Sequence, residues 1–329
     1  MNTIVQTDFG DPTRVLVPAD LPLPEPGPGQ VRVRVVAATV NTPDWLCTLG
    51  QPYLLRPMYG MFGPRAPVRG TDFAGEVDAL GLGVTDLAVG DAVLGSTGGF
   101  PFARSAPGAF RTHTVAPVDR LARKPPGLDW DHAAAAVMSG VVALQALRDV
   151  APVTPGRRVL IVGASGAIGT FAVPLAKSMG AHVTGVCSAG NVDLVRGLGA
   201  DAVIDRGATD WTTVDEGWDV ILDNVMAAPV AAARRRLRAG GVLIPNSVGP
   251  HPWWGPLPWL LAKATAGDAL RSVDHAPTRA NLDAVVAALG DGRTRCVMDG
   301  VWPLTRAAEA VARKASHRGR GSVGVRIEA

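Results

Sequence analysis

Two glycines spaced three residues apart give the chain its clearest chemical signal. Gly166 and Gly169 follow the apolar run 159–162 and open a segment with helical spacing. An apolar run without alternation is typical of a parallel strand that is buried on both faces. Glycine in the turn after such a strand lets the backbone approach a pyrophosphate, and the free N–H groups of the following helix attract the anion. The pattern predicts a dinucleotide site, although similar turns also occur in α/β proteins that bind no nucleotide.

The residues after this turn complete a strand, turn, helix and strand order. Helical spacing runs over 171–179 and stops at Gly180, and 181–187 reads as a second strand. In dinucleotide sites an acid near the end of that strand commonly binds the ribose hydroxyls of NAD, and NADP sites avoid it. Here Cys187, Ser188 and Asn191 stand at the strand end and no acid does. The pattern favours NADP(H) over NAD(H).

The remaining chain must position this unit, and its composition suits a two-domain globular protein. The chain has 329 residues, of which 47% are hydrophobic and 19% charged, and its formal net charge is +3. The basic runs 234–238 and 313–314 are short, as on solvated helix faces, so we expect no nucleic-acid partner.

The cysteines and the apolar stretches indicate which cellular compartment to expect. Cys47, Cys187 and Cys296 are far apart and form no zinc-binding pattern, which suits a reducing compartment. The first residues lack the pattern of a signal peptide, and the longest apolar stretch, 133–147, is short for a membrane span. We expect a cytoplasmic protein with no membrane partner.

Prolines and glycines divide the chain into a β-rich part and an α/β part. Short strands and tight turns fill residues 1 to about 122, which suggests a partly open barrel. Beyond the proline tract at 124–129, a helix is expected over 130–150, and strands and helices then alternate. This alternation predicts the α/β class with a doubly wound parallel sheet.

A tryptophan-rich segment stands outside the periodic elements. Trp253, Trp254 and Trp259 lie among four prolines in residues 250–265. The segment can be a buried plug, an oligomer contact or a lid over the substrate, and the sequence leaves these three interpretations open.

Several motifs in a fixed order give the chain a family resemblance. They are Asn41-Thr42-Pro43-Asp44-Trp45, Gly70-Thr71-Asp72-Phe73-Ala74-Gly75, Gly108-Ala109-Phe110, Ala164-x-Gly166-x-x-Gly169, and Cys187-Ser188-x-x-Asn191 followed by Leu198-Gly199-Ala200-Asp201. Together they resemble the zinc-free medium-chain dehydrogenase/reductases, within the quinone oxidoreductase and enoyl reductase branch. The resemblance covers nearly the whole chain.

The resemblance implies a fold, a domain division and an assembly. It implies a GroES-like β-barrel catalytic domain from residues 1–122 and 274–329, with a Rossmann dinucleotide-binding domain over 123–273 between them. It also implies a homodimer. Zinc-binding relatives have a cysteine where Asn41 stands and a histidine where Thr71 stands, so no metal is expected at this site.

A reductase without metal suits a conjugated acceptor. Hydride from a nicotinamide can add to the β-carbon of an enone while charge moves onto the carbonyl oxygen, which needs hydrogen-bond donors and a proton. The expected function is NADPH-dependent reduction of a small hydrophobic carbonyl compound, such as an enone or enoyl group, or of a quinone. Two alternatives stay open: a biosynthetic tailoring reductase or cyclisation enzyme for a large hydrophobic intermediate, and a non-catalytic NADPH-binding protein of the zeta-crystallin type.

The resemblance assigns the catalytic candidates Asn41, Asp44, Tyr53 and Thr71. Asn41 corresponds to an asparagine that holds the cofactor ribose or the substrate in relatives, but Asn41 and Asp44 can equally cap a helix start. Tyr53 corresponds to the tyrosine proton donor of related enoyl reductases, with water or a buried structural tyrosine as the alternatives.

The cofactor candidates lie on the glycine turn and at the ends of the predicted strands. In chain order they are Ser139, Gly163, Ala164, Ser165, Gly166, Ala167, Ile168, Gly169, Cys187, Ser188, Asn191, Arg206, Asn224, Val225, Ser247, Val248, Gly249 and Ser322. Relatives often carry a basic residue where Gly190 stands. Arg206 can instead bind the 2′-phosphate from the next strand end, or it is a plain exposed arginine. The strand ends at Asn224 and Ser247 can also be ordinary turns.

Overall fold

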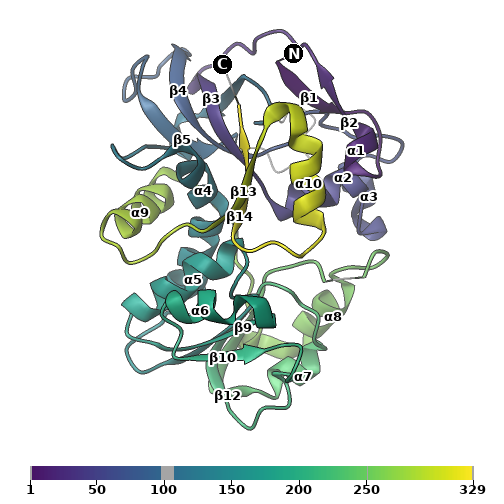
Figure 1. Ribbon diagram of the computed structural model, residues 1–329, viewed down its shortest axis with the longest axis vertical. Helices are drawn as coiled ribbons and strands as arrows, with labels where there is room; N and C mark the ends of the chain where they lie inside the picture. The colour runs from purple at the N-terminus through teal and green to yellow at the C-terminus, as the bar shows by residue number, and fades with distance from the viewer. Residues whose placement is uncertain (1, 98–106, 250, 328–329) are drawn as a thin grey trace. The chain divides into compact units, whose positions relative to one another are not determined.

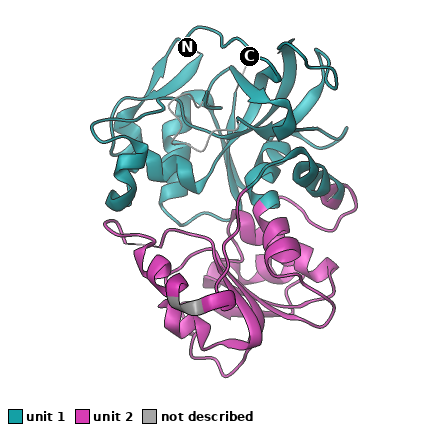
Figure 2. Cartoon of the chain, turned by 180° about the vertical axis from the view of Figure 1, so that it is seen from behind, with its two compact units in different colours: residues 1–141, 276–287, 297–329 teal, residues 142–275, 288–296 magenta. Residues whose placement is uncertain are grey.

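The structure is a computed structural model that describes residues 2–97, 107–249 and 251–327. Its contacts divide the chain into two compact units (Figure 1, Figure 2). Unit 1 comprises residues 1–141, 276–287 and 297–329, and unit 2 comprises 142–275 and 288–296. The first dividing point, after Val141, lies inside a helix, whereas the composition change used for the sequence-based boundary lies at the preceding proline tract.

Unit 1 is built on a seven-stranded sheet and a separate two-stranded one. The large sheet has the order β13-β14-β3-β4-β5-β7, and β6 pairs with β3; β1 and β2 form the small sheet. The strands are β1 Thr3–Gln6, β2 Leu16–Ala19, β3 Gln30–Val40, β4 Asp72–Leu80, β5 Ala92–Ser96, β6 His113–Pro117, β7 Leu121–Arg123, β13 Met298–Pro303 and β14 Ser322–Arg326. Through β14, the C-terminal segment pairs antiparallel with β3, so both ends of the sequence build one sheet.

The helices of unit 1 are mostly short. They are α1 Pro12–Val15, α2 Thr42–Leu49, the 3-10 turn η1 Tyr53–Leu55, α3 Arg56–Tyr59, α4 Trp130–Gln145, α9 Arg279–Gly290 and α10 Ala307–Ala315, with the last residues of α4 and α9 belonging to unit 2. The helix expected over 130–150 is present as α4 continued by a π-helical turn at Ala146–Val150. By length and composition this helix could cross a membrane, but 72% of its most apolar stretch is buried inside the protein, as in a core helix.

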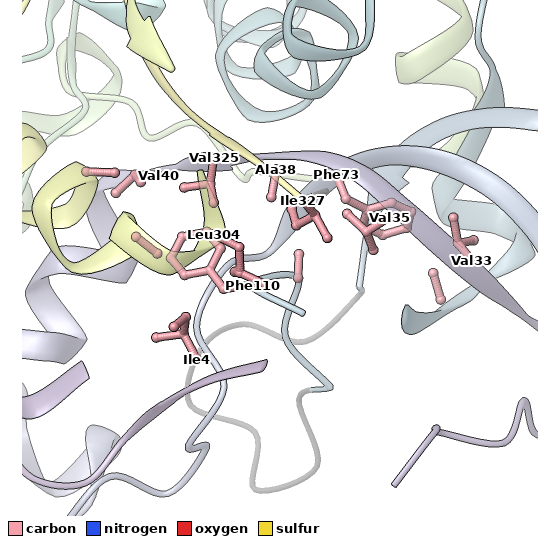
Figure 3. Packing of buried hydrophobic residues seen from close by; sticks show 14 of the residues in the cluster. Ile4, Val33, Val35, Ala38, Val40, Phe73, Phe110, Leu304, Val325 and Ile327 are labelled. Carbon is pink, nitrogen blue, oxygen red and sulfur yellow. The ribbon is translucent and has the colours of Figure 1, made fainter. Parts of the chain in front are cut away.

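The core of unit 1 joins residues from both ends of the chain. Alternate residues of β3, such as Val33 and Val35, point inward with Phe73 and Phe110, and Leu304 and Val325 pack against them (Figure 3). This period-two burial is what the alternating sequence of β3 predicts. The core therefore holds β3 and β4 rigid at the point where β3 ends and α2 begins.

Unit 2 contains a five-stranded parallel sheet in the order β10-β9-β8-β11-β12. Its strands are β8 Arg158–Val162, β9 His182–Cys187, β10 Ala202–Asp205, β11 Trp218–Asp223 and β12 Leu237–Pro245; its helices are α5 Ala167–Ser178, α6 Val192–Gly197, α7 Val230–Arg234 and α8 Leu257–Ala266. Numbered along the chain, this order is 3-2-1-4-5, which is the Rossmann order. The expected parallel sheet is confirmed.

One boundary differs from the sequence-based expectation. The apolar and basic run over 230–237 favours one helix, but α7 ends at Arg234 and β12 already begins at Leu237. Trp218 of β11 pairs with Leu237, and the ladder resumes at Val220 and Val242 after an irregularity. Tertiary pairing with β11 therefore extends the strand through Gly240 and Gly241, residues whose types disfavour strands.

Candidate functional site

The glycine turn of unit 2 has the tight packing that its sequence predicts. It links β8 to α5, and Gly163 takes the left-handed conformation with φ of 75°. A Cβ on Gly169 would lie 2.3 Å from the carbonyl oxygen of Gly163 and 2.6 Å from Cα of Ala164, so α5 approaches the turn at backbone distance. A Cβ on Gly166 would meet no atom closer than 3.3 Å, which leaves its outer side open to a ligand.

Ala164 stands where the usual pattern has its first glycine, and the structure explains why alanine fits. The left-handed conformation falls on the preceding Gly163. Both residues donate their N–H groups to the carbonyl of Val186 at 3.0 Å, which ties the turn to β9. Ala164 is fully buried. A Cβ added to Gly185 would lie only 3.0 Å from the Cβ of Ala164. A small residue on each side lets strand and turn pack closely.

The end of β9 is joined to the glycine turn by an amide. Asn191 donates from Nδ2 to the hydroxyl of Ser165 at 3.1 Å and to that of Ser188 at 3.2 Å. Cys187 is buried, and burial raises the pKa of its thiol, so it contributes backbone and bulk rather than a thiolate. The structure thus brings Ser165, Ser188 and Asn191 together in one polar group.

Arg206 lies beside this group. It follows β10 directly, its N–H donates to the Cys187 carbonyl at 2.8 Å, and its side chain is exposed. Gly190, where relatives often have a basic residue, has open space around it. Arg206 thus provides an exposed positive group near Cys187, at the end of β9, a strand end that itself carries no acid.

The ends of β11 and β12 are also connected. Asn224 donates from Nδ2 to the carbonyl of Val162 at 3.2 Å and accepts from Asn246 Nδ2 at 2.9 Å. Asp223, the last residue of β11, accepts from the N–H groups of Val225 and Met226 at 3.0 and 2.8 Å. Its carboxyl therefore fixes the turn that leaves Val225 partly exposed at this edge.

Parallel registry places all these residues at one edge of the sheet. The pairs Val162 with Val186, Asp205 with Cys187, and Asp223 with Pro245 align the carboxyl ends of the five strands. Ser247, Val248 and Gly249 follow β12 at the same edge. Ala167, Ile168 and Gly169 form the first turn of α5, whose N–H groups have no partner within the helix. The residues present fit an extended dinucleotide with a pyrophosphate at the helix start.

In unit 1, Asn41 and Asp44 form a helix cap. Asp44 accepts from the Asn41 N–H at 2.7 Å with one carboxylate oxygen and from the Gly70 N–H at 2.9 Å with the other. Together with Asn41 at the N-cap of α2, this is a capping box. Both oxygens of Asp44 are used by the backbone and the side chain is buried. The geometry supports the capping interpretation of Asp44, and its assignment to catalysis stays a prediction.

A second carboxylate, Asp72, contacts the candidate residues and was absent from the sequence-based site. Asp72 Oδ2 accepts from Asn41 Nδ2 at 2.8 Å and from the Met138 N–H at 3.0 Å. Asp72 is wholly buried on β4. The signal in the sequence was its place in the motif 70–75, where Thr71 alone was assigned a role. One carboxylate thus links Asn41 with the residue before Ser139.

The other candidates of unit 1 lie in different environments. Thr71 is buried next to Asp72, and Ser139 is buried in α4 directly after Met138. Ser322 begins β14, and its buried hydroxyl makes no hydrogen bond to the described residues. Tyr53 lies on η1 with the Arg56 guanidinium 5.8 Å from its ring centroid, and it is partly exposed. The structure therefore brings Asn41 and the Met138–Ser139 segment to Asp72, which follows Thr71, and places Tyr53 on a separate element, η1.

The two buried carboxyls give folding stability a pH dependence. Burial raises the pKa of Asp44 to about 6 and that of Asp72 to about 7, and the charge of Asp44 adds to the rise at Asp72. Both values exceed the unfolded value near 4, so the folded state holds these protons more tightly. Their contribution to stability is complete below about pH 4 and is lost as the pH rises through 6 and 7.

We therefore expect the free energy of unfolding to be lower at pH 7.5 than at pH 4.5 by roughly 5 kcal/mol from these two groups. Urea denaturation at several pH values measures how the free energy of unfolding changes with pH. Asp72→Asn should remove the part of this change that occurs near pH 7. An identical change in the variant would contradict the assignment.

The chemistry of unit 1 does not suit a catalytic zinc. Asn41 and Thr71 offer an amide and a hydroxyl, whereas zinc sites use thiolate, imidazole and carboxylate ligands. Burial raises the pKa of Cys47, one and a half turns along α2, to about 12, so its thiol is protonated. Across residues 2–97, 107–249 and 251–327, no group of three or more His, Cys, Asp and Glu residues is placed to hold a metal.

The tryptophan-rich segment divides into two parts. Pro250 lies outside the described residues. Trp253 and Trp254 are 63% and 48% exposed, and His251 stacks on Trp254 with ring centroids 3.7 Å apart. Trp259, on α8, packs against the core of unit 2. The structure thus favours the buried interpretation for Trp259 and leaves the other two tryptophans on the surface of this chain.

Two protein-family models match the chain. The alcohol dehydrogenase GroES-like domain matches residues 27–126, and a family described as zinc-binding dehydrogenase matches residues 198–323. The first match covers strands β3 to β7 of the large sheet of unit 1, which confirms the expected GroES-like part of the fold. The second model's description names a metal for which Asn41 and Thr71 supply neither thiolate nor imidazole.

Individual relatives agree with these models. A chloroplast envelope quinone oxidoreductase homolog of Arabidopsis thaliana is 29% identical over 336 residues, covering 98% of this chain and 97% of the relative. A trans-enoyl reductase of Aspergillus terreus is 38% identical over 198 residues, covering 58% of this chain and 53% of the relative. The solved quinone oxidoreductase of Coxiella burnetii has a TM-score of 0.87 at 24% identity, covering 100% and 99% of the two chains, and shows the same fold. The chain therefore belongs to the medium-chain dehydrogenase/reductase superfamily, in its quinone oxidoreductase and enoyl reductase branch.

Proposed function

We propose that this oxidoreductase uses NADPH to reduce a quinone or an α,β-unsaturated carbonyl compound without a metal. The observation that carries the proposal is the edge of the unit 2 sheet, where the glycine turn, the acid-free end of β9 and Arg206 lie on adjacent strands. The quinone and enoyl acceptors named for the relatives support the substrate class.

Each part of this edge has a task in binding. The first turn of α5 and the open side of Gly166 suit the pyrophosphate. Ser188 and Arg206 suit a 2′-phosphate, because they offer a hydroxyl and a guanidinium where NAD sites have an acid. Asn224, Ser247 and Val248 suit the nicotinamide end. When bound, the nicotinamide supplies hydride, and the chain supplies position, hydrogen bonds and a proton.

The reduction requires a proton at the substrate in addition to the hydride. The Tyr53 phenol is our proposed donor, with water as the alternative. The second tyrosine, Tyr59, is buried, and burial raises the pKa of its phenol further above the usual value, so it is the poorer donor.

The test of the proposed function is a panel of acceptors. NADPH oxidation should be followed by absorbance with quinones, enones and enoyl thioesters, next to NADPH binding without an acceptor. We expect binding, and turnover with at least one class. Binding without turnover of any acceptor would contradict the reductase and leave an NADPH-binding protein.

Arg206 should determine part of the preference for NADPH. With Arg206→Ala we expect the dissociation constant for NADPH to rise about tenfold and that for NADH to stay within twofold, because one charge-assisted contact to the 2′-phosphate is lost. Isothermal titration with both nucleotides measures the ratio. Arg196→Ala is the control, since Arg196 is exposed on α6 beside Asp193. An unchanged ratio in Arg206→Ala would reject the clamp.

Tyr53→Phe tests the proton donor. We expect kcat to fall at least tenfold with KM little changed, because the phenol acts in the chemical step and Phe keeps the ring. Steady-state kinetics with the best acceptor of the panel give both constants. Turnover within twofold of the wild type would assign the proton to water.

A further inference from the structure

A single buried oxygen atom joins two distant segments of unit 1. Asp72 Oδ2 accepts from the side chain of Asn41, 31 residues away, and from the backbone of Met138, 66 residues away. The two donors belong to α2's N-cap and to α4. The other oxygen, Oδ1, accepts no hydrogen bond of good geometry from the described residues. The Thr71 hydroxyl also interacts with this carboxylate as a hydrogen-bond donor. The two hydrogen bonds of good geometry converge on Oδ2.

The surroundings of Asp72 do not neutralise its charge. The charged group that faces it is Asp44 on α2, another carboxylate. The positive charges of Arg69 and of Lys314, which lies on α10, act on Asp44 and lower its pKa. From α4 the contact is the Met138 backbone, and opposite Asp72 on β5 stands Ser96, which is uncharged. A buried carboxylate without a cationic partner is costly, so its presence needs a reason other than stability.

We propose that Asp72 is the positioning residue of the unit 1 site, and that its negative charge holds the Asn41 carboxamide and the Met138–Ser139 segment in one fixed arrangement. The geometric part of this inference stands on the two hydrogen bonds. Its effect on the reaction rests on the proposed function together with the sequence-based assignment of Asn41 and Ser139 to contacts with the cofactor or the substrate.

The charge matters because hydrogen bonds to an ionised acceptor are roughly twice as strong as those between neutral groups. Burial and the nearby charge of Asp44 raise the pKa of Asp72 to about 7. On protonation both hydrogen bonds become neutral ones, and the Asn41 amide is held less firmly. The arrangement of the site should therefore change with pH in the protein without any ligand.

The first experiment is an NMR titration of the ligand-free full chain. Protein labelled with ¹⁵N at asparagine and methionine should show the Asn41 side-chain amide and the Met138 backbone amide titrating with one common midpoint. Asp72→Asn should abolish that titration. Asp131→Asn is the matched control, because Asp131 is another buried carboxyl of unit 1 and its partner is Arg326. Titration of both amides unchanged in Asp72→Asn would overturn the proposal.

The second experiment measures binding and catalysis. Asp72→Leu leaves the Asn41 amide and the Met138 N–H unpaired, so we expect KM or the NADPH dissociation constant to rise at least about tenfold. Asp72→Asn keeps an acceptor oxygen but loses the charge, so the same constant should rise by a smaller factor, about threefold, with a pH profile that lacks the Asp72 step. Asp72→Leu with constants like those of the wild type would contradict the positioning role.

The two experiments separate this inference from the proposed function. If the wild type neither binds NADPH nor reduces an acceptor, the proposed function fails, and the NMR titration still decides whether Asp72 holds Asn41. If the wild type is active and Asp72→Leu does not fold, Asp72→Asn and the titration still decide the question. Loss of the pH step together with retained turnover in Asp72→Asn is the result that supports positioning over a purely structural role.

Discussion

Alanine at position 169 is expected to abolish nucleotide binding, whereas alanine at position 166 should weaken binding and leave the fold intact. The added Cβ at 169 would lie 2.3 Å from the Gly163 carbonyl oxygen, so α5 and the turn must move apart. We expect unfolding free energy to fall by roughly 3 kcal/mol and NADPH affinity to fall more than about 100-fold. At 166 the Cβ would lie 3.3 Å from Gly163 O, a tight contact that a shift of a few tenths of an ångström relieves, and we expect it to project into the space where a pyrophosphate would approach.

The pair separates packing from binding when both quantities are measured. Urea denaturation gives the stability of each variant, and titration with NADPH gives its affinity. Gly290→Ala is the control, because a Cβ there meets no atom within 4 Å and the residue lies in unit 2. If Gly169→Ala were as stable as Gly290→Ala, the close approach of α5 to the turn would be wrong. If Gly166→Ala bound NADPH like the wild type, the pyrophosphate would lie elsewhere.

The parallel sheet could be predicted from the sequence because its strands are short apolar runs between glycines. Residues 159–162 and 181–187 are of this kind, and the structure has them as β8 and β9. The start of β12 could not be predicted, because Gly240 and Gly241 have low strand propensity and lie in the irregularity between the pairs Trp218–Leu237 and Val220–Val242. Local pattern decides the first case and tertiary pairing the second.

The candidate site shows the same division. The family resemblance identified Asn41 and the motif that contains Asp72, since both lie in recognisable stretches. The hydrogen bond between them depends on how β4 pairs with β3, whose register is shifted twice by irregularities. Such register shifts cannot be predicted from a pattern along the chain. The same is true of the hydrogen bond that Met138 donates to this oxygen. The hydrogen-bond partners of a buried carboxylate follow from the fold, and the motif gives only its place.

Asp44→Ala is expected to be among the most destabilising single substitutions in unit 1. The change removes the acceptor of two buried N–H groups, those of Asn41 and Gly70, and each unpaired donor costs on the order of 1–3 kcal/mol. Relief of the buried charge offsets a part of this loss, because burial raises the pKa of Asp44 to about 6. We expect the free energy of unfolding at pH 7 to fall by roughly 2–4 kcal/mol.

A matched cap elsewhere in unit 1 shows whether burial is the cause. Asp11 caps α1 and accepts from the Thr13 N–H at 2.9 Å, but it does so at the surface, where water can replace the lost acceptor. Asp11→Ala should therefore cost much less than Asp44→Ala in the same urea denaturation. Equal losses would show that the capping bond alone matters, and that the link from α2 to Gly70 adds nothing. A larger loss for Asp44→Ala means that this carboxylate joins the start of α2 to the segment before β4, the two segments that carry Asn41 and Asp72.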